Sequence, residues 1–141
     1  MKDPAPVRVW ALLARTRQLR VERLRRALND ARASAGRAAS DVASQRTALA
    51  EHDAMRRSIL ASCSWGGSGA ALWRMTLRRH DAGKFALESA LFVACDVKQK
   101  ADGRVVAALH ALQKEMRGLD DARERLRRLM VSLQDVGDPD D

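Results

Sequence analysis

Hydrophobic residues recur along this chain at alternating steps of three and four positions, in two long stretches. A repeat of about 3.5 residues keeps one apolar seam on one side of an α-helix, and it is typical of coiled coils. Few polar residues interrupt either series. The first seam comprises Val7, Trp10, Ala14, Arg17, Val21, Leu24, Leu28, Ala31, Ala35, Ala38, Val42, Gln45, Leu49, His52, Arg56 and Ile59. The second comprises Leu87, Leu91, Ala94, Lys98, Ala101, Val105, Ala108, Leu112, Glu115, Leu119, Ala122, Leu126, Leu129, Leu133 and Val136.

Two helices of this kind in one chain predict an all-α fold, a long antiparallel two-helix coiled-coil hairpin. We expect one coiled-coil domain over residues 1–141, with a bend that carries a short helix. The predicted parts are helix 1 at about 5–61, the bend and short helix at about 62–84, helix 2 at about 85–135 and an acidic tail at 136–141.

The two seams stay in phase along their whole length if Val7 faces Val136. This register sets Arg17 beside Leu126 and Leu28 beside Glu115. Each of these pairs places a charged side chain against a leucine in the seam, which is unfavourable. Two explanations remain open: the long polar side chains extend to the surface, or the true register differs by one heptad.

The bend reads "SCSWGGSGAALWRM" and is rich in glycine, but it does not match a phosphate-binding loop. That loop needs the pattern G-x-x-x-x-G-K-[ST], and no Lys-Ser or Lys-Thr pair follows these glycines. The three histidines, His52, His80 and His110, are scattered without the spacing of metal ligands. We therefore expect no catalytic residues, no metal site and no cofactor, and we predict that the protein is not an enzyme.

Aromatic residues gather in and beside the bend. Trp65, Trp73 and Phe85, together with Leu77, offer an apolar surface at that end of the hairpin. Such residues either form a small cluster that closes the hairpin or provide a contact for a partner, because the end of a two-helix structure buries aromatics poorly. Both interpretations stay open.

The formal net charge is +8, and arginine is concentrated in the first predicted helix. Nucleic-acid binding is less favoured than a solvated helix exterior, because the arginines lie all round the helix and acidic residues interrupt them. No stretch is long and apolar enough for a signal peptide core or a membrane span. Cys63 and Cys95 are isolated thiols, which favours a cytoplasmic protein.

A small, basic chain rich in alanine and arginine, with two long seams and an arginine-rich first helix, resembles the FliJ/YscO (SctO) family. Its members are central stalk proteins of type III secretion and flagellar export. The bend here is longer than a minimal hairpin turn. The resemblance implies that the end bearing both termini enters a hexameric secretion ATPase. It also implies that the hairpin tip contacts an export-gate membrane protein at the secretion apparatus. Secretion chaperones would be further partners.

The resemblance also implies roles for particular residues. The ATPase-contacting set would be Arg8, Arg15, Arg17, Arg20, Arg123, Arg127 and Arg128, and the gate-contacting set Trp65, Trp73, Leu77 and Phe85. Two other functions compete with this one. The first is a coiled-coil interaction or chaperone-like protein, and the second, less favoured, is a basic protein associated with nucleic acid.

Overall fold

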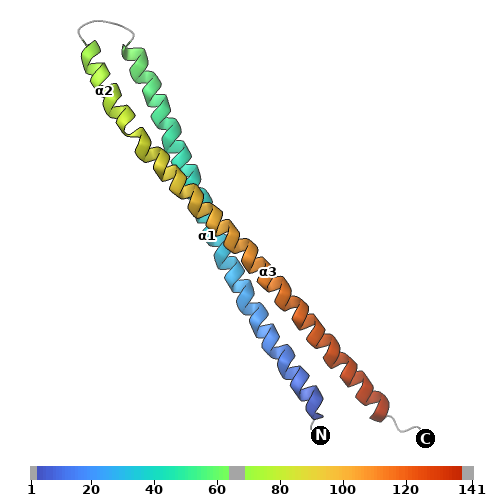
Figure 1. Ribbon diagram of the computed structural model, residues 1–141. Coiled ribbons are helices and arrows are strands. Elements are labelled where there is room, and N and C mark those ends of the chain that lie inside the picture. The colour runs from blue at the N-terminus through green and yellow to red at the C-terminus, as the bar shows by residue number, and fades with distance from the viewer. Residues whose placement is uncertain (1–2, 64–68, 138–141) are drawn as a thin grey trace. The chain divides into compact units, whose positions relative to one another are not determined.

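The protein is an all-α helical hairpin, as predicted, in which α1 and α3 run antiparallel (Figure 1). The computed structural model describes residues 3–63 and 69–137, and these residues contain no β-strand. Helix α1 spans Ala5–Cys63, α2 spans Ala70–Ala82 and α3 spans Lys84–Gly137. The two long helices and the short helix in the bend therefore lie close to the positions that the repeat predicted.

Local sequence explains where the helices begin and end. Pro6 lies in the first turn of α1, where its missing N–H would have no helical partner in any case. The backbone N–H of Arg8 donates to the carbonyl oxygen of Pro4 at 3.1 Å. Gly83 separates α2 from α3 but keeps a right-handed helical conformation, with φ −79° and ψ −15°. The chain consequently passes from α2 into α3 almost without a break.

The chain divides into two compact units. Unit 1 combines the start of α1, through Arg32, with α3 from Arg104 onward. Its core consists of Val21, Leu28, Leu112 and Leu119, a pair of residues seven apart on each helix. Burying side chains of this size stabilises the fold by roughly 1.5–3 kcal/mol each, so these four residues dominate the packing of unit 1.

Unit 2 spans Ala33–Gly103 and contains the rest of α1, all of α2 and the beginning of α3. Its buried hydrophobic residues are Ala38, Val42, Ile59 and Ala101, and α2 itself contributes none. Every buried hydrophobic residue of the described chain, in both units, occupies a position of the two predicted seams. Unit 2 buries smaller side chains than the core of unit 1, so its helices depend more on polar contacts.

The register of unit 1 differs from the predicted one. Arg17 forms an ion pair with Glu115 at 3.5 Å and lies over Gly118, so it does not face Leu126. Leu126 lies about 16 Å further along α3 than Glu115, at 1.5 Å per residue. Val136 is 82% exposed although Val7 is buried, so these two residues do not face each other either. Partners of α1 residues lie nearer the N-terminal end of α3 than expected, which leaves the end of α3 without a covering helix.

Candidate functional site

Unit 1 brings the seven predicted ATPase-contacting arginines onto one helix pair, but the structure separates them into two groups. Arg8, Arg15 and Arg20 are exposed on α1, and none of them makes an ion pair within the described residues. They are free to meet an external acidic group. Arg17, by contrast, is half-buried and engages Glu115 of α3.

The three arginines of α3 all have partners inside unit 1. Arg123 Nη2 donates to Gln18 Oε1 at 2.7 Å, which links α3 to α1. Arg127 and Arg128 both donate to the carboxylate of Glu124, with the shortest contact at 2.7 Å. These hydrogen bonds hold the pKa of Glu124 below its usual value, because they stabilise its charged form. The charged Glu124 offsets one of the two positive charges of Arg127 and Arg128. These three residues together therefore offer a partner less positive charge than the two arginines alone would.

A second contact between the helices of unit 1 involves Trp10. The guanidinium carbon of Arg125 lies 5.1 Å from the centre of the indole ring, within the range of a cation–π interaction. Trp10 was predicted only as a seam residue. The contact depends on the register, so the repeat alone could not reveal it.

The side of α1 that faces away from the seam carries exposed leucine among arginine. Leu12 is 66% exposed and Leu19 is 56% exposed, each with large apolar area open to solvent. Leu19 also borders a shallow surface depression of about 270 Å³, whose other lining residues are Thr16, Arg20, Arg23 and Arg26. We call this surface, including Arg8 and Arg15, the Leu–Arg face. The sequence held a signal for it, because Leu12, Thr16, Leu19, Arg23 and Arg26 follow a second series of three- and four-residue steps.

The predicted gate-contacting residues have different environments in unit 2. Trp65 lies outside the described residues. Trp73 is 40% exposed and lies beside Gly69, and Leu77 is half-buried. Phe85 is 78% exposed. Among the described members of this set, Phe85 is therefore the most open to solvent.

A pair of histidines joins α2 to α1. The Nε2–H of His52 donates to the carbonyl oxygen of His80 at 2.8 Å, and that of His80 donates to the carbonyl oxygen of His52 at 2.7 Å. The two rings are stacked, with centroids 3.6 Å apart. We call this arrangement the histidine clasp. The sequence predicted both histidines at the surface or at the edge of a seam: His52 is a position of the first seam, and His80 falls on the second series when that series is continued backward from Leu87.

Two ion pairs flank the histidine clasp. Arg56 Nε donates to Asp81 Oδ1 at 2.9 Å, and Lys84 Nζ lies 3.6 Å from Asp53 Oδ1. The hydrogen bond from Arg56 holds the pKa of the Asp81 carboxyl below its usual value. Three residue pairs thus attach α2 and the start of α3 to α1, in a region where α2 buries no side chain.

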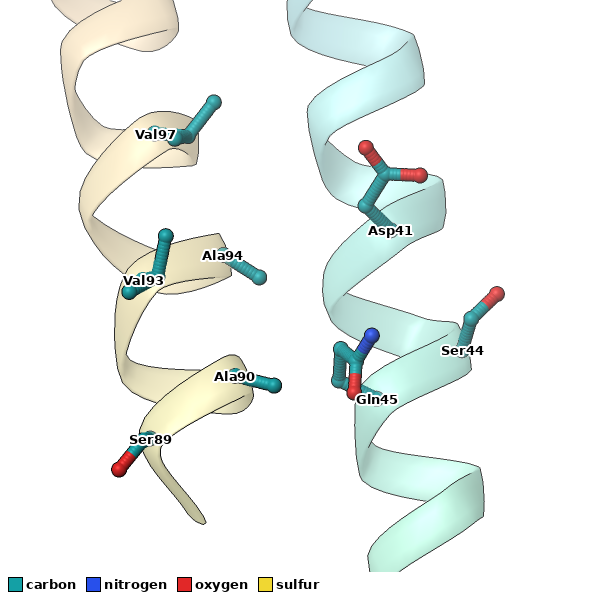
Figure 2. A pocket seen from close by; sticks show the side chains of 8 residues that line it. All are labelled: Asp41, Ser44, Gln45, Ser89, Ala90, Val93, Ala94 and Val97. Carbon is teal, nitrogen blue, oxygen red and sulfur yellow. The ribbon is translucent and has the colours of Figure 1, made fainter. Parts of the chain in front are cut away.

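A groove of about 420 Å³ lies between α1 and α3 in unit 2 (Figure 2). In this view Ala90 and Ala94 of α3 and Gln45 of α1 point toward one another, whereas Ser89 points away from α1. The groove exists because these small side chains do not fill the space between the helices. It is open, and its lining of alanine, valine, serine, Gln45 and Asp41 carries no arrangement for catalysis.

The cysteines and acidic residues of the described chain form no further cluster. Cys63 and Cys95 are free thiols. No group of three or more histidine, cysteine or acidic residues within the described ranges is arranged to hold a metal ion. Among the helices described, none has the length and apolar character needed to cross a membrane.

Comparison with known proteins returned no match, whether with protein-family models, with curated proteins or with solved structures.

Proposed function

We propose that this protein is a non-enzymatic central stalk protein of a type III secretion system. In this function the end that bears both termini inserts into the hexameric secretion ATPase, and the hairpin tip contacts the cytoplasmic part of the export gate. The stalk thereby couples ATP hydrolysis to protein export. The protein acts in the cytoplasm, at the periphery of the secretion apparatus.

One observation carries the proposal: Arg8, Arg15 and Arg20 are exposed on a helix pair and have no acidic partner within the described chain. Unpaired surface arginines attract acidic groups without first having to break an internal ion pair. Several modest contacts of this kind, spread along a helix, allow a shaft to bind a pore without locking in one position. The resemblance in seams and charge described above supports the same function.

The test is stimulation of a purified rotary-type secretion ATPase from the same source. We expect added protein to promote hexamers and to raise the rate of ATP hydrolysis. Reversing Arg8, Arg15 and Arg20 to Glu should weaken binding at least about tenfold, since three attractive contacts become repulsive. Arg17 is left unchanged, because its ion pair with Glu115 belongs to the fold.

A matched control makes the same charge change in unit 2. Arg37, Arg46 and Arg57 are also exposed, and their reversal to Glu should leave stimulation intact. If both triple variants lost stimulation of the ATPase equally, the effect would depend on the net charge of the protein and not on the position of Arg8, Arg15 and Arg20. Absence of both stimulation and binding by the unaltered protein would exclude the stalk function.

A coiled-coil interaction or chaperone-like protein is the second candidate, and exposed apolar residues of unit 2 favour it. Phe85, Phe92 and Val93 are more than half exposed on the first turns of α3. A protein that binds an isolated secretion substrate, yet stimulates no ATPase, would fit this function. Association with nucleic acid is least favoured, and a binding affinity that does not change with salt would rule out phosphate contacts by the arginines.

A further inference from the structure

A stripe of side chains on α2 and the start of α3 leaves its large apolar members exposed to solvent. Its members follow steps of four and three residues, on the opposite side of these helices from the buried seam. Met75 is 54% exposed, Phe85 78% and Phe92 77%. We call this the outer stripe, and it comprises Ala71, Met75, Arg78, Ala82, Phe85, Ser89, Phe92 and Asp96.

The spacing of the outer stripe indicates what kind of surface covers it. Alternating steps of four and three keep side chains in line along one side of a helix, and exposed phenylalanines in such a line form a surface that a second helix can cover, as in the buried seams of this chain. Gly83 does not interrupt the line, because its backbone is helical and its carbonyl accepts from the N–H of Leu87 at 3.4 Å. The stripe therefore continues across the junction of α2 and α3.

The outer stripe is complementary to itself when a second copy runs antiparallel. With the two-fold axis beside Gly83 and Lys84, every stripe position faces another stripe position. Ala82 then faces Phe85 of the second copy, and Arg78 faces Ser89 of the second copy. Each of these layers joins a large side chain to a small one, which is how helices interdigitate.

Charge favours the same arrangement. The antiparallel register places Arg79 opposite Glu88 of the second copy, and the two-fold axis generates this pair twice. Both residues are exposed, and neither forms an ion pair within the described chain. A parallel copy in register would instead bring Arg78 and Arg79 against the same arginines, which is repulsive.

We propose that two copies of this protein associate through the outer stripe, as an antiparallel pair of α2–α3 junctions. The second copy covers Phe85 and Phe92. It leaves free Trp73 and Leu77, which face the other side of α2, and also the Leu–Arg face of unit 1. This association uses none of the ATPase-contacting arginines, but it covers Phe85, so the dimer and a gate contact through Phe85 exclude each other.

Sedimentation equilibrium of the full chain under reducing conditions tests the proposal. We expect a mass of twice 15.6 kDa at sufficient concentration. Converting Phe85 and Phe92 to Ser should yield a monomer with unchanged helicity, since neither side chain contributes to the buried core. A monomer at millimolar concentration, or a dimer unaffected by this double change, would overturn the proposal.

A charge exchange tests the orientation. Arg79→Glu alone and Glu88→Arg alone should each raise the dissociation constant of the dimer by at least about tenfold, because two attractive pairs become repulsive. Combining both changes restores opposite charges across the axis and should restore the dimer. The same exchange would not rescue a dimer formed by another face, so failure of the double variant to recover would refute the antiparallel register.

Discussion

Replacing His80 by Ala isolates the contribution of the histidine clasp. The change removes the hydrogen bond from His80 to the His52 carbonyl and the ring stacking at 3.6 Å. The bond from His52 to the backbone carbonyl of residue 80 remains available. One part-buried hydrogen bond contributes about 1 kcal/mol and one stacked ring pair about 1 kcal/mol. We therefore expect α2 to be held to α1 less strongly by about 2 kcal/mol.

The loss should be local, because α2 buries no side chain of its own. Hydrogen exchange read by mass spectrometry measures the opening of residues 70–82 directly. A change of 2 kcal/mol corresponds to roughly thirtyfold faster exchange in these amides, at about 1.4 kcal/mol per factor of ten. Amides around the unit 1 core at Val21 and Leu119 should keep their protection.

Two further variants make the experiment decisive. His110→Ala removes an exposed histidine of unit 1 and should leave α2 unchanged. His80→Phe keeps a ring against His52 but removes the donor, so its effect should be intermediate, near fivefold for about 1 kcal/mol. If His80→Ala and His110→Ala gave the same exchange in residues 70–82, the clasp would not hold α2, and the reasoning would be refuted.

Two other predictions concern acid and the core. The lowered pKa of Asp81 means that its ion pair with Arg56 stabilises the fold at neutral pH and is lost as the pH falls through that lowered value, below about 4. NMR spectra of α2 amides should change over this acid range in the unaltered protein. In the Asp81→Asn variant, α2 should be attached less strongly already at pH 7, and its amide spectra should change less when the pH is lowered. Leu28→Ala should lower the free energy of unfolding by about 2–4 kcal/mol in urea titrations, because the residue is 5% exposed within the unit 1 core. Leu12→Ala is a matched change at a 66% exposed position of the same helix, and it should lower the free energy of unfolding by less than about 0.5 kcal/mol. An equal loss of stability in the two variants would contradict the assignment of the core.

The repeat in the sequence predicted which residues are buried, because the side of a helix on which a residue lies depends only on its position in the chain. Val21, Leu28, Leu112 and Leu119 illustrate this, since all are seam positions and together form the unit 1 core. The register could not be predicted in the same way. Seams that repeat every seven residues fit in several alignments, and polar contacts such as that of Arg17 with Glu115 decide between them.

The candidate sites were predicted less well than the core, and for a related reason. Charge concentration located the arginines in unit 1, but it could not tell exposed Arg15 from Arg17, which is half-buried in an ion pair across the helices. The histidine clasp needs His52 and His80 to meet from positions 28 residues apart. Such a pairing depends on how α2 packs on α1, and no local spacing encodes it.

The core of unit 1 and the attachment of α2 to α1 rest on interactions that respond differently to temperature. Leucine and valine stabilise unit 1, and burial of apolar surface loses strength on cooling. Helix α2 and the first residue of α3 are attached through hydrogen bonds and ion pairs of His80, Asp81 and Lys84, and these polar contacts do not lose strength on cooling in that way. Cooling should therefore weaken the apolar core of unit 1 more than the attachment of α2 to α1. The relative stability of these two parts of the chain is consequently a function of temperature.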